Sequence, residues 1–311
     1  MKRVADLPPR LLQDLLAGPG LRVRTGPVVM SIRSSVPEVI TGVALLYAEH
    51  PCTADDEMAD FHVGVRRTGG WRRWVGSQVS FVLDGTRPFN ALPGNQGFPL
   101  LEWGMNWCIS GLAPQYLTLH AAVLERHGRA LLLPAPSGSG KSTLCAALMN
   151  RGWRLLSDEL AVIDPSTAKV LPIPRPVSLK NASIGLIRQF APDTVFGRTV
   201  TETLKGDVAH IKPPAEAVRR ADEAAPPGWV VIPRFECGAP ARLSPMGKCA
   251  ALMRLIENAF NYNIHGRAGF EALARIVESS TCHVLAYDAL DDGVQCLERL
   301  SAGASASAHE V

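Results

Sequence analysis

A short segment rich in glycine and serine carries the residues with the clearest chemical potential in this 311-residue chain. Its members are Ala135, Pro136, Ser137, Gly138, Ser139, Gly140, Lys141, Ser142 and Thr143. Backbone N–H groups of such a loop can approach a phosphate closely because its residues are small, Lys141 can add positive charge, and the Ser142 hydroxyl can ligate Mg²⁺. The segment therefore predicts a phosphate-binding loop, with ATP or another nucleoside triphosphate and Mg²⁺ as cofactors.

The flanking sequence places this loop between a strand and a helix. The apolar run 130–133 is typical of a buried strand, and apolar residues recur at helical spacing from Leu144 until Gly152. One position departs from the pattern G-x-x-x-x-G-K-[S/T], because Ala135 stands where the first glycine usually lies. A turn without a ligand is the competing interpretation of the same residues.

Two acidic residues follow the loop after a single predicted helix. Asp158 and Glu159 interrupt the segment 154–164, which is typical of two short strands with a hinge between them. Phosphoryl transfer needs metal ligands and a group that orients the attacking hydroxyl and accepts its proton. We expect the strand before Asp158 to return beside the loop strand and bring the carboxylates to Ser142. Acidic residues at a solvated strand end would have the same pattern.

A histidine lies on the apolar strand that precedes the loop strand. The runs 119–124 and 130–134 are joined by a polar turn, which predicts an antiparallel hairpin that leads directly into the loop. A doubly wound nucleotide-binding sheet reaches its loop through a helical crossover, so the hairpin indicates a different lineage. His120 could reach Asp158 or a substrate from this hairpin. A core histidine bonded to backbone is the competing interpretation.

The order and spacing of these segments resemble the catalytic core of HPr kinase/phosphorylase. That family has a His-Gly-containing strand, a G-x-S-G-x-G-K-S loop and an R-G-x-R-L-x-x-D-D segment, and the matching residues here lie within 119–159. The resemblance implies an α/β P-loop kinase core with a mixed sheet, of the type shared with ATP-dependent phosphoenolpyruvate carboxykinases. In this chain a β-rich N-terminal region would precede that core.

The resemblance also implies a role for each matching residue. His120 and Asp158 would assist attack by a serine hydroxyl, with Lys141 acting on the phosphates. Ser142, Asp158 and Glu159 would hold Mg²⁺. These assignments follow from the family pattern and agree with the chemistry expected of the residue types.

Departures from the family pattern make its carrier-protein substrate a poor guide. Ala121 replaces the glycine after the histidine, Ala135 replaces the first loop glycine, and Glu159 replaces an aspartate. The segments 180–181, 210–214 and 260–263 have counterparts in HPr-kinase-related proteins of the kinase A group, which the whole chain resembles more closely. Genes of that group accompany small PqqD-like peptide-binding proteins. The resemblance therefore implies a peptide or small-protein acceptor, presented by a PqqD-like protein, and a homo-oligomer.

A proline-rich segment, 165–235, carries further basic and polar side chains. Loops of this kind are common places for substrate contacts, so we assign acceptor or phosphate contacts to Arg175, Lys180, His210 and Lys212. An ordinary solvated loop explains each of these residues equally well.

The remaining sequence predicts three parts of the chain. Residues 1–112 alternate apolar and polar side chains over short stretches and predict a β-rich region, with one helix at 99–110, that could be a small separate domain. Residues 113–300 form the predicted kinase domain. The Ser/Ala-rich segment 301–311 predicts a disordered tail.

Composition argues against several classes of protein. Net charge is only +3 with mixed signs, and the segment Trp71–Val75 is better explained as a hairpin than as an aromatic nucleic-acid platform. Apolar stretches are too short for a bilayer span, and the N-terminus lacks a signal-like core. Seven scattered cysteines without a C-x-x-C pair predict reduced thiols. We therefore expect a cytoplasmic protein that binds neither nucleic acid nor membrane.

Three functions remain open at this point. The leading hypothesis is an ATP- and Mg²⁺-dependent kinase that phosphorylates a hydroxyl, serine above all, of a peptide or small protein. A small-metabolite kinase is the second, and a P-loop NTPase that acts as a switch is the third. Transporter ATPases place an L-S-G-G-Q-type signature before their acidic pair, whereas here a single helix separates that pair from the loop. The choice of ATP over GTP and the reverse phosphorylase reaction stay open.

Overall fold

The computed structural model describes residues 2–53, 58–69, 77–136 and 138–307, with side chains as far as residue 303 in the last helix. The chain divides into two compact units. Unit 1 comprises Met1–Leu112, Ile173–Ile184 and Asp193–Ala221, and unit 2 comprises Ala113–Pro172, Gly185–Pro192 and Asp222–Val311. Both units combine α-helices with β-sheets, so the mixed α/β class is as predicted. Two segments that we assigned to the kinase domain from sequence, 173–184 and 193–221, are grouped in unit 1.

Unit 1 is built around a seven-stranded sheet with the order β1-β4-β2-β3-β5-β6-β7. Its strands are β1 (Lys2–Arg3), β2 (Leu21–Thr25), β3 (Val28–Ser34), β4 (Pro51–Thr53), β5 (Phe61–Arg67), β6 (Gln78–Leu83) and β7 (Leu92–Pro93). Strands β3 and β5 are parallel, and the other neighbours are antiparallel. The hairpin predicted at Trp71–Val75 lies outside the described residues, since 70–76 are not described.

Among the described residues, three α-helices accompany this sheet, so the region is not made of strands alone. They are α1 (Pro9–Ala17), α2 (Pro37–Leu46) and α3 (Gly97–Leu112), with the short 3-10 helices η1 (Val4–Asp6) and η3 (Gly94–Gln96). Helix α3 confirms the helix predicted at 99–110. The helices α1 and α2 were not predicted. Each begins with proline at its first position, which is a common helix start, but α2 packs against both α1 and α3 and lacks a polar face.

The later segments of unit 1 form a second, three-stranded sheet in the order β14-β16-β15. Its strands are β14 (Val177–Lys180), β15 (Val200–Thr203) and β16 (Gly206–Ile211), and α6 (Ala215–Arg219) follows. Between β14 and β15 the helix α5 (Ala182–Phe190) continues from unit 1 into unit 2.

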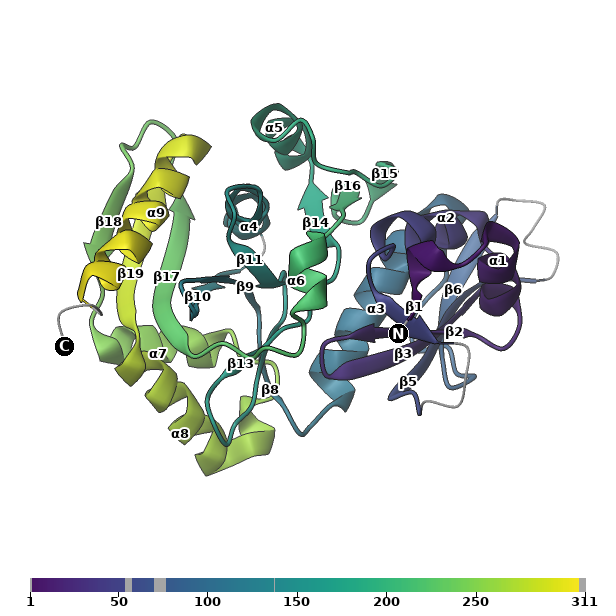
Figure 1. Cartoon of the computed structure of the whole chain (residues 1–311), viewed down its shortest axis with the longest axis horizontal. Coiled ribbons are helices and arrows are strands. Elements are labelled where there is room, and N and C mark those ends of the chain that lie inside the picture. Colours follow the sequence, from purple (N-terminus) through teal and green to yellow (C-terminus); the bar gives the residue numbers. More distant parts are fainter. Residues whose placement is uncertain (1, 54–57, 70–76, 137, 308–311) are drawn as a thin grey trace. The chain divides into compact units, whose positions relative to one another are not determined.

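Unit 2 contains a six-stranded mixed sheet in the order β11-β9-β10-β17-β19-β18 (Figure 1). Its strands are β9 (Ala121–Arg126), β10 (Arg129–Pro134), β11 (Arg154–Ser157), β17 (Pro227–Phe235), β18 (Arg242–Pro245) and β19 (Thr281–Tyr287). Strands β10, β17 and β19 are parallel, so their carboxyl ends share one edge of the sheet. Strand β9 is antiparallel to both of its neighbours, β10 and β11, so β11 runs in the same direction as β10, and β18 is antiparallel to β19.

The hairpin predicted before the loop is confirmed as β9 and β10. Its two-residue turn consists of His127 and Gly128, whose φ values are 53° and 75°. Positive φ at both positions gives a turn whose twist matches that of the strands, and glycine adopts it without strain. The chain therefore leaves β10 at Pro134 and enters the loop directly.

The strand that leads to Asp158 pairs differently from the prediction. Strand β11 pairs with β9 and not with the loop strand β10, so β9 lies between them. Beyond a short hinge, β12 (Ala161–Ile163) joins β8 (Leu117–Leu119) and β13 (Val170–Leu171) in a three-stranded sheet. The two short strands with a hinge are thus confirmed. The predicted pairing of this strand with β10 was wrong, because β9, the other strand of the hairpin, lies next to β10 on that side.

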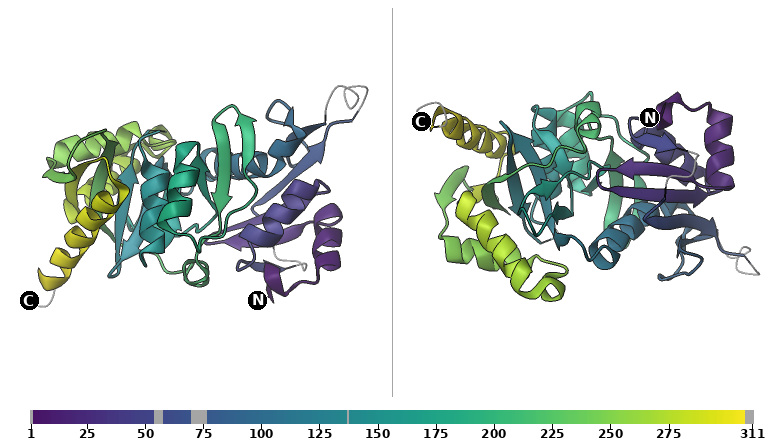
Figure 2. Two further views of the ribbon diagram at one scale, coloured as in Figure 1. Left: turned by 90° about the horizontal axis from the view of Figure 1, so that it is seen from above. Right: turned by 60° about the horizontal axis from the view of Figure 1, so that its bottom comes forward.

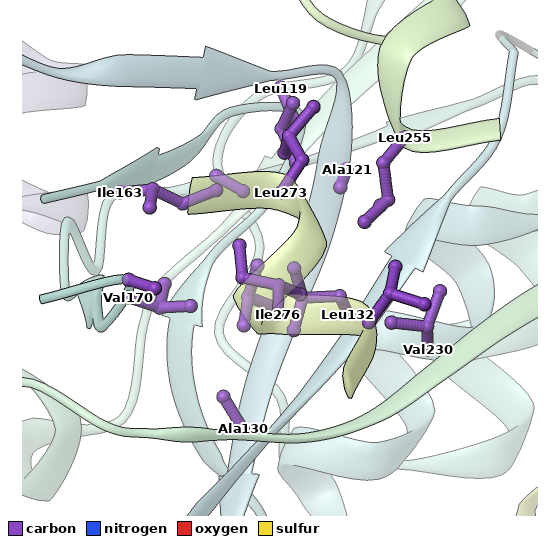
Figure 3. Packing of buried hydrophobic residues seen from close by; sticks show 14 of the residues in the cluster. Leu119, Ala121, Ala130, Leu132, Ile163, Val170, Val230, Leu255, Leu273 and Ile276 are labelled. Atoms are coloured by element: carbon purple, nitrogen blue, oxygen red, sulfur yellow. The ribbon is translucent and has the colours of Figure 1, made fainter. Parts of the chain in front are cut away.

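Helices cover the six-stranded sheet and complete its core. They are α4 (Lys141–Asn150), α7 (Lys248–Glu257), α8 (Tyr262–Ser279) and α9 (Leu290–Ser307). Helices α7 and α8 lie side by side in Figure 1 and Figure 2, and α4 packs against β9 and α9. In Figure 3, Leu273 and Ile276 of α8 lie over strand residues that include Leu132 and Val230. Because strands covered by helices are buried on both faces, they have the continuous apolar sequences seen here.

Helix α9 extends further than the sequence pattern predicted. It continues to Ser307, so residues 301–307 are helical although they belong to the predicted disordered tail, and 308–311 lie outside the described residues. Alanine is a strong helix former, and Ser301 is buried and donates its hydroxyl to Glu298 O. No helix in the described parts of the chain has both the length and the apolar character to cross a membrane.

Candidate functional site

The loop between β10 and α4 turns on two glycines in the left-handed region. Gly138 has a φ of 89° and Gly140 a φ of 84°, values that residues with a Cβ rarely adopt. The N–H of Leu144 donates to Gly140 O at 2.9 Å, which closes the first turn of α4. The backbone N–H groups of that turn, with the positive end of the helix dipole, therefore lie at the loop.

The remaining loop residues have different exposures. Ala135, which replaces the usual first glycine, is 1% exposed, so its methyl group is accommodated inside the unit. Lys141 is buried as the first residue of α4, and Pro136 is exposed. Ser139 and Thr143 are half-buried, and Ser137 lies outside the described residues. The loop thus offers backbone and small polar groups together with one lysine.

Gly140 also leaves room for the end of strand β19, because it has no side chain. A Cβ at this position would lie 2.7 Å from the Tyr287 hydroxyl, closer than real Cβ atoms approach. Tyr287 is the last residue of β19 and is 3% exposed, and burial raises its pKa to about 12. Its hydroxyl therefore stays protonated at neutral pH. We did not predict Tyr287 from sequence, although its place at the end of an apolar strand was a usable signal.

The structure brings Ser142 and Asp158 into contact. The Ser142 hydroxyl donates a hydrogen bond of 3.0 Å to Asp158 Oδ1, and both residues are half-buried. Glu159 follows with a φ of 66° in the left-handed region, which non-glycine residues seldom occupy. This sharp turn separates β11 from β12 and lets the two neighbouring carboxylates leave the strand at a kink.

His120 lies opposite this turn. Leu119 pairs with Ala161 and Val123 pairs with Ser157, so the segment around His120 faces the segment 158–160. The next residue along, Ala121, is paired with the last residue of the loop strand. The His120 N–H donates to the backbone of Asn258 at 2.7 Å, and its ring contacts Phe260 with centroids 5.9 Å apart. The loop, the histidine and the acidic turn therefore converge in unit 2.

The side chains at the loop fit the type of Mg²⁺ site that phosphate-binding loops have. Within the described residues, no group of three or more His, Cys, Asp and Glu side chains could hold a metal ion. Mg²⁺ in phosphate-binding loops does not need such a group, because it takes one hydroxyl and one or two carboxylates and completes its shell with phosphate oxygens and water. Ser142 in contact with Asp158, followed by Glu159, is a hydroxyl and two carboxylates, the residue types that such a site uses.

Two of the four predicted substrate residues have acidic partners inside unit 1. Arg175 is 6% exposed, donates to Asn106 Oδ1 and lies 4.0 Å from Glu102. The Lys212 ammonium donates to Glu49 at 3.0 Å. Both cations therefore have ion-pair partners within unit 1 that explain their positions without a substrate.

The other two predicted substrate residues also belong to unit 1. Lys180 is half-buried at the end of β14. His210 on β16 is 3% exposed, and its ring stands edge-on to Phe98 with centroids 5.3 Å apart. His210 lines a cavity of about 220 Å³ with apolar residues of α2 such as Leu45 and Leu46. All four residues are thus in unit 1, whereas the loop and its acidic partners are in unit 2.

Comparisons with known proteins add little to this site. No protein-family model matches the chain, and no curated protein matches it. Among solved structures, one similar chain is the Hpr(Ser) kinase/phosphatase from Coxiella burnetii, with 13% sequence identity and a TM-score of 0.27. The match covers 60% of this chain and 98% of that one. A similarity this weak assigns no activity to this chain, whose own residues must carry the functional argument.

Proposed function

We propose that this chain is an ATP- and Mg²⁺-dependent kinase that phosphorylates a hydroxyl, with a serine of a peptide or small protein as the acceptor. The observation that carries the proposal is the hydrogen bond from Ser142 to Asp158, beside a loop that turns on Gly138 and Gly140. A phosphate loop, a loop hydroxyl and a carboxylate in contact are the parts that a phosphoryl donor site needs.

On the donor side, the chain's residues bind and orient a nucleoside triphosphate. Loop N–H groups at the start of α4 hold the phosphates, and Lys141 adds a positive charge. Ser142, Asp158 and Glu159 would hold Mg²⁺, which neutralises charge on the outer phosphates when it is bound. The left-handed conformations of Gly138 and Gly140 support this role, because they let the loop backbone turn tightly before α4.

On the acceptor side, a carboxylate accepts the proton of the attacking hydroxyl. The hydroxyl oxygen bonds to the γ-phosphorus as the bond from that phosphorus to the β-phosphate oxygen breaks, and the proton passes to Asp158. His120, on the segment facing Asp158, supports the carboxylate or the transferring group. The acceptor class rests on the motif resemblance alone, which is an association and not a geometric argument. A PqqD-like protein that presents a peptide is the corresponding partner.

The test is to identify what receives the phosphate. The full-length protein is incubated with γ-labelled ATP, Mg²⁺ and a lysate of its native cells, and the labelled species are identified by mass spectrometry. We expect label on a serine of a peptide or small protein. Label confined to small molecules would make it a metabolite kinase, and ATP hydrolysis without a labelled acceptor would make it a switch NTPase.

A matched pair of variants tests the role of Asp158. Asp158→Asn should still bind ATP but transfer almost no phosphate, because the amide cannot accept the proton. Asp222→Asn is the control, since Asp222 is an exposed aspartate of the same unit and should keep both properties. Transfer at the normal rate by Asp158→Asn would remove Asp158 from the mechanism.

A further inference from the structure

Two aromatic residues stand where β17 and β19 end. Phe235 and Tyr287 are the last residues of these strands and are paired neighbours across them. Their rings are nearly perpendicular, at 82°, with centroids 6.2 Å apart. Tyr287 is 3% exposed, whereas Phe235 is 57% exposed. An exposed phenylalanine supported by a buried tyrosine leaves an aromatic surface open to a ligand.

This aromatic pair lies beside the phosphate loop. A Cβ on Gly140 would be 2.7 Å from the Tyr287 hydroxyl and 3.9 Å from Phe235 Cβ. Leu132 of the loop strand pairs with Val230, so β17 continues three residues past the level of Pro134 to reach Phe235. Those residues extend about 10 Å alongside the loop.

The position of Tyr287 is held from a second direction. A Cβ on Gly293 would lie 2.9 Å from Tyr287 Cδ2, so the glycine lets α9 pack closely against the tyrosine ring. The tyrosine is therefore fixed between the loop and α9. Phe235 therefore contacts a fixed tyrosine ring on one side and is exposed to solvent on the other.

The aromatic pair and Asp158 lie on opposite sides of the loop strand. Strands β9 and β11, which lead to Asp158, are on one side of β10, and β17 and β19 are on the other. A triphosphate whose terminal phosphate points toward Ser142 and Asp158 has its base at the far end of the molecule. Strands β17 and β19 lie on the side of the loop strand away from β9 and β11, which is where that end can lie.

We infer that Phe235, supported by Tyr287, stacks on the base of the nucleoside triphosphate. This inference rests on the proposed nucleotide site and adds its base-binding element. A phenyl face carries no hydrogen-bonding groups, so it holds adenine and guanine alike and does not select between them. Stacking of this kind contributes a factor of about 5 to 100 in affinity.

The test compares ligands with and without a base. Dissociation constants of ATP, GTP and inorganic tripolyphosphate are measured by calorimetry for the full-length protein and for Phe235→Ala. We expect the variant to lose about 5- to 100-fold in affinity for both nucleotides and to keep its affinity for tripolyphosphate. Phe235→Trp should retain nucleotide binding, and Phe270→Ala, which removes an exposed phenylalanine of α8, should change none of the three constants.

The possible failures can be told apart. If Phe235→Ala binds ATP as tightly as the unaltered protein, or loses ATP and tripolyphosphate equally, the stacking role is wrong and the nucleotide site stands. If the unaltered protein binds neither ATP nor tripolyphosphate, the proposed function itself fails. Because Phe235 is exposed, we expect its variants to fold, and unchanged thermal melting is the check.

Discussion

Charged and polar groups are used differently in the two units. In unit 1, Arg175 and Lys212 are paired with Glu102 and Glu49, so their charges are satisfied within the fold. In unit 2, the groups that meet at the loop are half-buried and lie at the carboxyl edge of parallel strands. A buried cation beside an internal acid has its partner within the fold, whereas polar groups gathered at such an edge lie where ligands of open α/β sheets commonly bind.

The same contrast occurs along one strand of unit 2. Arg154, the first residue of β11, forms a buried ion pair of 2.6 Å with Glu125 and donates to Glu223 O. Asp158 follows the other end of β11 and contacts Ser142. One end of the strand is thus anchored by a closed polar network, and the other end offers its carboxylate at the loop. The anchored end can hold the functional end in place.

The largest expected effect is on catalysis, in unit 2. Lys141→Met should lower the rate of phosphoryl transfer by about 10²- to 10³-fold, because a charge aimed at the phosphates is lost. The free energy of unfolding should not fall, since methionine fills a similar buried volume. Single-turnover transfer and urea unfolding measure the two effects. A large loss of stability with little loss of rate would make Lys141 a structural residue.

The next effect is on stability, in unit 1. Arg175→Met should reduce the free energy of unfolding by about 3–5 kcal/mol, because Glu102 stays buried without its cation. Urea unfolding measures the loss, and the double variant with Glu102→Gln should recover part of it. A stable Arg175→Met protein that fails only with its acceptor would instead support the substrate contact predicted from sequence.

A pH effect should also belong to unit 1. Burial lowers the pKa of His50 to about 4, and its Nε2–H donates to Pro174 O at 2.9 Å. The unfolded histidine has a pKa near 6.5, so between pH 6.5 and 4 it binds a proton while the folded histidine stays neutral. The free energy of unfolding should therefore fall by about 3 kcal/mol as the pH drops from about 6.5 to 4. Urea midpoints across this range check it. His50→Gln should flatten that part of the profile; an unchanged slope would exclude His50 as its cause.

The smallest effect is expected at Lys212. Its pair with Glu49 is partly exposed, so Lys212→Met should cost at most about 1 kcal/mol of unfolding free energy. The KM for the acceptor separates the two interpretations of this residue. An unchanged KM fits a structural ion pair, whereas a raised KM at normal kcat would assign Lys212 to acceptor binding and weaken the contrast between the units.

Features specified by local sequence were predictable. The hairpin before the loop depends on a two-residue turn and two apolar runs, and the left-handed turns depend on Gly138 and Gly140. The division of 154–164 into two strands follows from a polar interruption in an apolar segment. In each case neighbouring residues carry the information, because backbone preference and turn chemistry act over a few positions.

Features that depend on distant pairing were not predictable. The place of β9 between β10 and β11 follows from strand pairing, which has no local signature. Helix α2 was missed because its exposed side includes apolar residues such as Ala44 and Leu45, so it lacks the polar face that marks a surface helix. Residues 173–184 and 193–221 fold with unit 1 because of contacts formed with residues far earlier in the chain.

By itself, the sequence determined the chemistry available at the loop: the glycines, Lys141, Ser142 and the acidic pair at Asp158. Only the tertiary structure decided that Ser142 contacts Asp158 across an intervening strand, and that Phe235 and Tyr287 end beside Gly140. The reason is physical. Residue type and local spacing set which bonds a side chain can make, but sheet order and register set which side chains meet.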